Sequence, residues 1–213
     1  MGVKPAATPP GRNPLIAVTV IWALALIASG IAPHDRPTWF LEVLPVLIAA
    51  PILIATRSSL PLTRLAYALI CVHGLILILG GAYTYARVPP GIWVQEWLGL
   101  VRNPYDRLGH LAQGFVPAIV ARELLLRVFG IGRGRLLFFL VVCICLAISA
   151  LYELIEWWVA LAFGEGAHDF LGTQGDEWDT QWDMFLALVG AVLSLLTLGG
   201  LHDRQLRNMP PPA

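Results

Sequence analysis

Charged residues are scarce in this chain. Asp, Glu, Lys and Arg together make up 13% of its 213 residues, against 57% hydrophobic residues, whereas a soluble domain has about a quarter of its residues charged. Water is therefore not its main solvent. The net charge is zero and no run of Lys or Arg is present, so nucleic acid is not an expected partner.

Cysteine is scarce as well, and the common cofactor motifs are missing. Cys71, Cys143 and Cys145 all lie within apolar runs, where Cys usually behaves as a small buried hydrophobe. This placement argues against a disulfide framework or a thiolate metal site. The sequence has no Walker or dinucleotide pattern and no evident Ser–His–Asp set, so we expect no nucleotide cofactor.

What the chain has instead is long apolar runs. A helix needs about 20 residues to cross roughly 30 Å of hydrocarbon, and several runs come close to that length. We therefore predict an all-α fold, a polytopic transmembrane helical bundle of about six spans that forms one domain in the lipid bilayer (residues 14–201), with tails at 1–13 and 202–213. The predicted spans are Pro14–Ala32, Phe40–Ala55, Leu65–Tyr85, Asp106–Phe129, Leu136–Phe163 and Asp183–Leu201.

The first two runs need interpretation. The first follows basic residues and so imitates a signal peptide, but its apolar stretch, Leu15–Ala32, is longer than the roughly 7–15 residues of a signal-peptide core. We interpret it as a retained span. The second run is interrupted by Glu42, Pro45 and Pro51, which predicts a tilt, a kink or insertion only partway.

The placement of basic residues predicts an orientation. With the N-terminus inside, nine Lys and Arg residues fall on the cytoplasmic side and four outside, so both termini are expected in the cytoplasm. Seven of the eight tryptophans map to the outer side, where their rings prefer the headgroup level. We also expect a short interfacial helix near residues 91–101 and an acidic outer loop at 164–182.

The fourth run is too polar to pass a simple hydropathy criterion, yet its apolar residues recur at helical spacing. Four of its residues lie on one stripe, because Asp106, His110, Gln113 and Pro117 follow i, i+4, i+7, i+11. This stripe begins at the outer end. Asp106 can therefore orient the imidazole of His110, or both can face one ion.

Acidic residues cluster late in the sequence. Eight of the fourteen lie between Glu153 and Asp183, and a carboxylate at membrane depth is costly unless it is paired, hydrated or metal-bound. Glu153 and Glu156 are i, i+3 neighbours near the outer end of the fifth span, while Asp176, Asp179 and Asp183 step i, i+3, i+7 into the sixth. Three helices thus bring acids and one His to one membrane face.

Carboxylates together with one imidazole are ligands that suit the divalent cations Mg, Mn, Ca or Zn. The sequence therefore indicates a candidate metal site. The candidate ligands are Asp106, His110, Glu153, Glu156, Asp176, Asp179 and Asp183, the candidate catalytic groups are Glu153, Glu156 and Asp183, and the supporting polar residues are Arg107, Gln113 and Gln174. The alternative is a bundle of buried hydrogen-bonded pairs without a ligand, for example Arg107 with Glu153 or Asp183.

Other polar residues have simpler interpretations. His73, near the middle of the third span, is expected to be packed and hydrogen-bonded, and His168 to be exposed to solvent. Glu123 and Arg127 form an i, i+4 pair that supports a helix end. Gln174-Gly175-Asp176 favours a turn leading into an Asp-capped helix.

Three stretches carry a family resemblance: 106–114 (DRLGHLAQG), 152–157 (YELIEW) and 172–184 (GTQGDEWDTQWDM). Through them, and over essentially its whole length, the chain is similar to the YjdF-type bacterial inner-membrane proteins. That family is a domain of unknown function, so the resemblance implies a multi-pass inner-membrane protein and no established reaction. The order of an Asp-x-x-x-His helix, an acidic helix and an Asp-led helix also loosely resembles VanZ-like membrane proteins.

Three functions remain in competition. The first is a metal-dependent membrane enzyme that acts on a lipid or lipid-linked substrate at the outer, periplasmic face with a carboxylate-activated water. The second is a transporter or ion-coupled permease, for which polar residues near the midplane and broken helices are typical. The third is a noncatalytic membrane scaffold with a buried polar network. The polar residues lie at one face, which argues against transport.

Overall fold

The computed structural model describes residues 12–164 and 168–211, and these residues form helices and loops without a strand among them. The elements are α1 (Arg12–Ile31), α2 (Arg36–Thr56), α3 (Arg64–Tyr83), the 3-10 helix η1 (Tyr85–Arg87), α4 (Pro89–Leu98), α5 (Tyr105–Arg127), α6 (Arg135–Phe163), α7 (His168–Leu171) and α8 (Asp179–Leu206). Most of the predicted N-terminal tail, residues 165–167 of the acidic loop and residues 212–213 lie outside the described residues.

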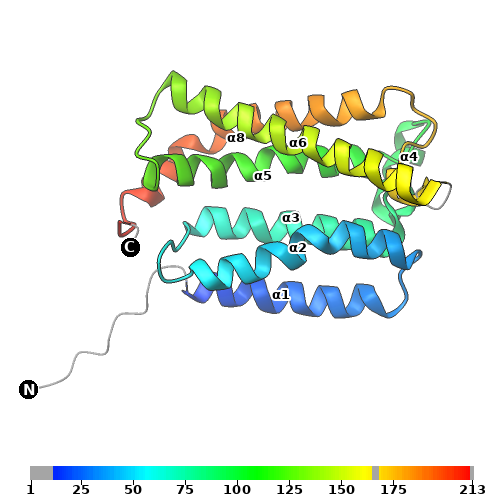
Figure 1. The fold of residues 1–213 in the computed structure, drawn as a ribbon, viewed down its shortest axis with the longest axis horizontal. Coiled ribbons are helices and arrows are strands. Elements are labelled where there is room, and N and C mark those ends of the chain that lie inside the picture. The colour runs from blue at the N-terminus through cyan, green and yellow to red at the C-terminus, as the bar shows by residue number, and fades with distance from the viewer. Residues whose placement is uncertain (1–11, 165–167, 212–213) are drawn as a thin grey trace, which may run out of the picture.

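Five helices, α1, α2, α3, α6 and α8, are long and apolar enough to cross a membrane. The predicted fourth span corresponds to α5, which has 23 residues and lies alongside the others (Figure 1). The chain is therefore an all-α membrane helical bundle, as predicted, with five candidate spans among the described residues and α5 as the expected sixth.

The long helices form two layers (Figure 1). One layer is α1, α2 and α3, the other is α5, α6 and α8, and they meet chiefly where α3 contacts α5. In the first layer the Trp22 indole of α1 donates a hydrogen bond of 3.2 Å to the backbone oxygen of Cys71 on α3. Its ring occupies the space that a side chain at Gly74 would need.

The pair α5 and α8 is the most extensive helix contact, and glycines allow it. A Cβ atom on Gly114 of α5 would overlap the carbonyl oxygen of Ala187, and one on Gly190 of α8 would overlap the carbonyl oxygen of Leu111. Small residues let membrane helices approach this closely. Because His110 precedes Gly114 by one turn and Asp183 precedes Ala187 by one turn, this crossing sets the two side chains against each other.

Helix α2 is continuous over 21 residues although Pro45 and Pro51 lie inside it. The Asp35 side chain caps it by accepting a 2.8 Å hydrogen bond from the Thr38 N–H. Its length and hydropathy are those of a full span, which favours crossing over insertion only partway.

Helices α8 and α4 end at other residues than the sequence predicts. Helix α8 begins before Asp183 and continues past Leu201 to Leu206, so the first part of the predicted tail at 202–213 is helical. Hydropathy marks only the residues within the hydrocarbon, whereas polar residues extend a helix beyond it. Helix α4 ends earlier than residue 101, because Gly99 adopts a left-handed φ of +63° that terminates the helix.

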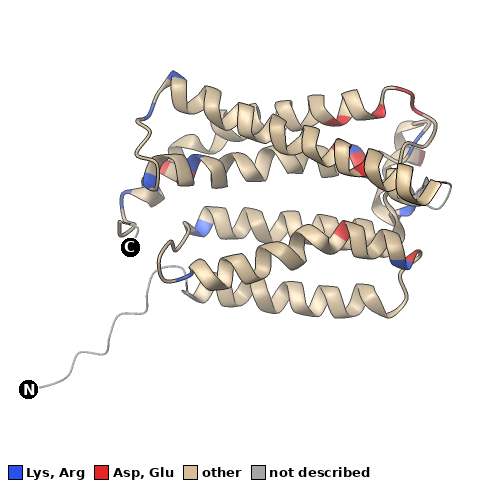
Figure 2. Cartoon of the chain, viewed as in Figure 1, with Lys and Arg blue, Asp and Glu red and all other residues tan. Residues whose placement is uncertain are grey.

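The bundle has two polar ends (Figure 2). We call the end where α5 and α8 begin the α4 end, and the end where α1 begins and α8 finishes the terminal end. Acidic residues gather at the α4 end, while Arg57, Arg64, Arg135 and Arg204 lie at helix ends toward the terminal end. This distribution agrees with the predicted orientation, but the membrane side that each end faces stays a prediction.

Candidate functional site

His110 of α5 is the centre of a buried polar cluster at the α4 end. Its Nε2 lies 3.5 Å from Asp106 Oδ1 and 3.8 Å from Asp183 Oδ2, and its Nδ1 lies 3.8 Å from Glu153 Oε1. Helices α5, α6 and α8 each contribute to this cluster. We call Asp106, His110, Glu153, Glu156 and Asp183 the α4-end cluster.

Two groups of potential metal ligands share His110. Asp106, His110 and Asp183 each offer an atom within 4.8 Å of the others, and all three residues are buried. His110, Glu153 and Glu156 form a second such group. Ligand atoms at such separations can contact one shared ion, because metal–ligand bonds are about 2.0–2.6 Å long.

Two carboxyl groups of the cluster each keep one oxygen without a hydrogen bond among the described residues. Asp183 Oδ1 and Glu153 Oε1 are buried and have no hydrogen-bond partner, and the two residues are 2% and 8% exposed. A buried polar atom without a partner costs about 1–3 kcal/mol, more if it is charged. The neighbouring Ser149 hydroxyl of α6 is buried and unpaired as well. Within the described residues these oxygens therefore have no hydrogen-bond partner, and a bound cation would supply one.

The ring of His110 faces acceptors on both sides. Its Nδ1 lies 3.1 Å from Gln113 Oε1, an amide oxygen that accepts a hydrogen bond when Nδ1 carries the proton. Its Nε2 then points toward the carboxylates of Asp106 and Asp183. A proton or a metal ion at Nε2 would be stabilised by these carboxylates.

The predicted ligands Asp176 and Asp179 belong instead to an arginine pair. Arg102, which is 9% exposed, donates to Asp106 at 2.9 Å, to Asp179 and to the carbonyl of Gly172 at 3.2 Å. Arg107 donates to Asp176 at 2.9 Å. Arg107 therefore pairs with neither Glu153 nor Asp183, so both pairings suggested for it by the sequence are wrong.

Asp176 lies in the loop before α8 and is held as a carboxylate. A hydrogen bond from the Trp178 N–H and the charges of Arg102 and Arg107 lower its pKa below the ordinary value. The predicted turn is present, since Gln174 and Gly175 both have positive φ. Helix α8 is not capped by an Asp side chain, however. Its N-cap residue is Trp178, which makes no side-chain cap hydrogen bond, and Asp176 accepts from the Trp178 N–H, which precedes the first helical residue.

Asn103 fixes the loop that carries Arg102. Its side chain donates to the carbonyls of Ala86 and Val88 at 3.2 and 3.1 Å and accepts from the Tyr105 N–H at 3.0 Å. Gln174, predicted as a supporting residue, exchanges two hydrogen bonds with the Asn103 backbone at 2.9 and 3.1 Å. The loops before α5 and α8 are thereby joined.

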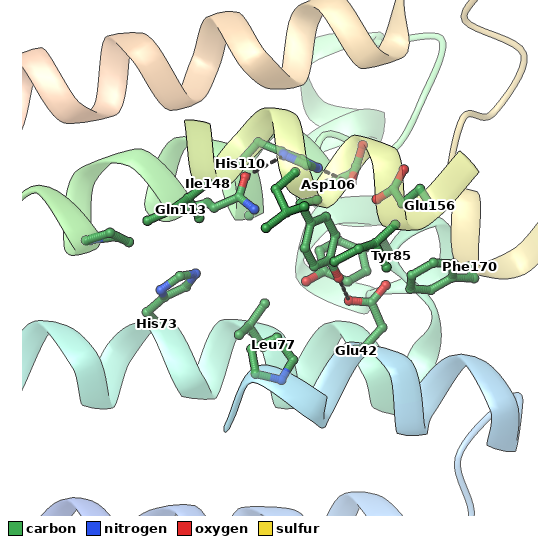
Figure 3. A pocket seen from close by; sticks show the side chains of 16 residues that line it. Glu42, His73, Leu77, Tyr85, Asp106, His110, Gln113, Ile148, Glu156 and Phe170 are labelled. Carbon is green, nitrogen blue, oxygen red and sulfur yellow. Dashed lines mark hydrogen bonds and ion pairs between the residues drawn. The ribbon is translucent and has the colours of Figure 1, made fainter. Parts of the chain in front are cut away.

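A cavity of about 340 Å³ adjoins the cluster (Figure 3). The predicted α5 stripe of Asp106, His110, Gln113 and Pro117 forms one wall. The other lining residues are Glu42, Pro45, His73, Leu77, Tyr85, Gly109, Ile148, Leu151, Tyr152, Ile155, Glu156 and Phe170.

Two cavity residues were not expected there. Glu42 of α2, seen only as an interruption of the second run, is buried and accepts a 3.4 Å hydrogen bond from Tyr152. His73 lines the cavity, and its ring has no hydrogen bond within the described residues, so the expected hydrogen bond of His73 stays a prediction. In Figure 3 its ring projects into the open space.

A second buried network occupies the terminal end. Glu123, which is fully buried, accepts hydrogen bonds from the Thr63 N–H at 3.0 Å, the Thr63 hydroxyl at 2.8 Å and Arg127 at 2.6 Å. His202 Nε2 lies 3.1 Å from Glu123, and Arg122 donates to His202 Nδ1 at 3.0 Å. We call Thr63, Arg122, Glu123, Arg127, His202 and Asp203 the terminal-end network.

The sequence revealed little of this network. The predicted Glu123–Arg127 pair is present, but it is the buried centre of the network and not just a helix-end pair. The sequence predicts a tail at residues 202–213, so it gives His202 no place in the bundle. The side chain of His168 and residue Glu165 lie outside the described residues, so exposure of His168 stays a prediction.

Comparisons with known proteins agree with the fold. A family model described as "Predicted membrane protein (DUF2238)" matches residues 14–204. "Inner membrane protein YjdF" of Escherichia coli (strain K12) is 58% identical over 198 residues, which cover 92% of this chain and 95% of that protein. No solved structure matches the chain. The looser similarity to VanZ-like proteins stays a prediction.

Proposed function

The chain belongs to the DUF2238 family of predicted membrane proteins, and we propose that this multi-pass inner-membrane protein is an enzyme that holds a divalent cation in the α4-end cluster and acts on a lipid-type substrate. One observation carries the proposal. Asp106, His110 and Asp183 place three buried ligand atoms within 4.8 Å of one another, beside unpaired carboxylate oxygens and a cavity.

The charge balance supports a cation. Arg102 and Arg107 pair with three acids, Asp106, Asp176 and Asp179. The three acids that remain, Glu153, Glu156 and Asp183, have only the His110 imidazole as a basic neighbour among the described contacts. Grouped acids of like charge are unfavourable away from water, and a divalent ion offsets two of these charges.

The residues then take distinct roles. Asp106, His110 and Asp183 would hold the cation, which when bound polarises an oxygen or activates a water. Gln113 would orient the ring through the contact between its amide oxygen and Nδ1. Glu153 and Glu156, on the next helix and one helical turn apart, are the groups that can accept a proton from such a water.

A permease is the second candidate, because one observation favours it. The cavity extends along α5 from Asp106 to Pro117, roughly 16 Å at 1.5 Å per residue, and reaches His73 near the middle of α3. Polar groups at that depth are typical of transport pathways. Metal-dependent flux into vesicles reconstituted with the pure protein would favour this candidate over the enzyme.

Elemental analysis of the detergent-purified protein tests the metal site. The parent should contain about one equivalent of Mg, Mn, Ca or Zn, or bind one of them on addition with a rise in melting temperature that a chelator reverses. His110→Ala should lose both the ion and the rise. Glu96→Ala removes an exposed acid on α4 and should change neither. A metal-free parent whose melting ignores all four ions would contradict the proposal.

The proposal also places the α4 end on the periplasmic side. A cysteine introduced at exposed Glu177, in the loop before α8, should react with a membrane-impermeant maleimide in intact cells, whereas one at exposed Ser58, between α2 and α3, should not. The parent with its three native cysteines is the control. Reversed labelling would put the cluster on the cytoplasmic side.

A further inference from the structure

The cavity is lined by side chains that also face outward. From α6, Ile148, Leu151 and Ile155 line it, yet they are 41%, 51% and 36% exposed. On a helix that spans a membrane, exposed aliphatic side chains contact lipid. The α6 wall of the cavity is therefore continuous with the lipid-facing surface.

The opposite wall comes from α2, which hardly packs against α6. Within the described residues these two helices are not among the pairs in substantial contact. A hydrogen bond of 3.4 Å from Tyr152 on α6 to Glu42 on α2 joins them. Glu42 and Pro45 line the cavity on the α2 side. The space between α2 and α6 is thus an opening toward the bilayer, crossed by one long hydrogen bond.

The α4 end of the cavity is covered by protein. Phe170 of α7 lines the cavity and is 4% exposed, and α7 contacts α2, α6 and η1. Figure 3 shows the Phe170 ring beside Glu42 at this end. A molecule therefore meets an aromatic wall from the side of the aqueous loops, but the aliphatic side chains of Ile148, Leu151 and Ile155 from the side of the lipid.

We propose that the opening between α2 and α6 is a lateral portal for one hydrocarbon chain of a bilayer amphiphile that carries a phosphate-type headgroup. The cavity of about 340 Å³ is at the small end of ligand pockets, about 300–1,000 Å³. It admits a headgroup and the adjoining part of one chain, while the rest stays in the bilayer.

The headgroup chemistry rests on the proposed function. The acids Glu42, Asp106 and Glu156 face the cavity and repel a phosphate on their own, whereas a divalent cation at His110 binds phosphoryl oxygens. Chain entry needs no cation, because a hydrocarbon chain makes apolar contacts with the cavity walls and does not bind the ion. Binding of the headgroup and entry of the chain are therefore separable.

Photolabelling of the full-length protein in nanodiscs of uncharged phosphatidylcholine tests both parts. The probes are a long-chain alkyl phosphate and the matching alkyl alcohol, each with a diazirine on the chain, used with Mn²⁺ or with EDTA. We expect label on cavity residues such as Pro45, Leu77 and Ile148, lost on competition with the unlabelled compound. EDTA should weaken labelling by the phosphate and leave that by the alcohol unchanged.

Two matched variants give the control. Leu151→Trp fills the opening and should lower cavity labelling by about fivefold or more, the effect of overpacking a fitted site. Leu154→Trp changes a neighbouring exposed leucine, 45% exposed, that does not line the cavity, and should leave labelling unchanged. Leu151→Ala widens the opening and should raise it. Melting curves confirm that each variant is folded.

The possible failures are distinct. Label spread evenly over lipid-facing residues, with no response to either Leu151 variant, overturns the portal whatever the metal does. Cavity labelling by the alcohol, together with phosphate labelling that ignores Mn²⁺ and EDTA, keeps the portal and overturns both the headgroup assignment and the metal site.

Discussion

His110 and His202 lie on the two helices of one pair, both nearly fully buried and both beside a carboxylate, yet their surroundings differ. His202 accepts from Arg122 at Nδ1 and donates to Glu123 at Nε2, so a neutral imidazole satisfies both partners. His110 meets oxygen acceptors on both sides. A neutral His202 therefore has a suitable hydrogen-bond partner at each ring nitrogen, whereas a neutral His110 does not.

The same contrast holds for the surrounding carboxyl groups. Both oxygens of Glu123 accept several hydrogen bonds, and none of the buried atoms without a partner belongs to the terminal-end network. At the α4 end, Asp183 and Glu153 each keep an unpaired oxygen. A satisfied network stabilises a fold, whereas an unsatisfied one next to a cavity indicates a ligand. This comparison yields four predictions.

The largest effect is expected at the terminal end. Replacing Glu123 with Ala leaves Arg127 without its carboxylate and the Thr63 N–H without its acceptor, and breaking a buried ion pair in this way costs about 3–5 kcal/mol. Thermal or denaturant unfolding in detergent measures the loss. It should be the same with and without divalent cations. A loss of stability that depends on added metal would contradict this prediction, because it would show that the terminal-end network and the α4-end cluster are coupled.

At the α4 end the loss should depend on metal. Asp183→Asn removes a ligand, so the stabilisation by a cation, about 2.7 kcal/mol at a hundredfold excess over its Kd, should disappear. In chelator the variant should be as stable as the parent or more stable, because one of several like charges is gone. Melting curves with Mn²⁺ and with EDTA test this. Equal destabilisation in both buffers would make Asp183 a structural residue like Glu123.

The glycine crossing should affect both ends together. Gly114→Ala places a methyl group against the carbonyl oxygen of Ala187 and forces α5 and α8 apart, at a cost of about 1–3 kcal/mol. Metal affinity should fall as well, because His110 and Asp183 lie on different members of the pair. Gly132→Ala, where a Cβ meets nothing within 4 Å, is the control. An unchanged metal affinity would show that the cluster tolerates helix separation.

The smallest effect is a pH dependence of Asp176. Its pKa is lowered in the folded protein, so it contributes stability above its ordinary pKa, and this contribution is lost as pH falls through the folded value. Between about pH 5 and pH 2, Asp176→Asn should flatten the decline in melting temperature. Glu96→Gln, an exposed acid on α4, should keep the decline of the parent. An identical slope in parent and Asp176→Asn would contradict this role.

The sequence predicted the fold and the stripe on α5 well, because both depend on local spacing. Asp106, His110 and Gln113 share a helix face in any α-helix, and the helix ends of α6 and α8 placed Glu153 and Asp183 at the same depth. Their convergence on His110 follows once the helices pack. Whether the cluster binds an ion stays a prediction.

Pairings between distant residues could not be predicted. Arg102 precedes α5 by a few residues, and its partner Asp179 lies in another helix, so no periodicity connects them. Glu123 and His202 are likewise joined only by the packing of α5 on α8. Hydropathy also hid His202, since the apolar run ends before it. The one available signal was the pair His202-Asp203 after the last apolar run, since the end of α5 is also charged and could supply its partner.

The polar character of α5 has a consequence for biogenesis. It is the one long helix of the described chain that misses the hydropathy criterion for a span, and its main partner, α8, is synthesised after α6 and the acidic loop. A ribosome that has just completed α5 therefore exposes a segment whose buried Asp, His, Arg and Glu side chains have no α8 to receive them. We therefore expect stable insertion of α5 to await the last helix. In chains truncated before residue 179, α5 should stay outside the bilayer or the chain should be degraded by quality-control proteases.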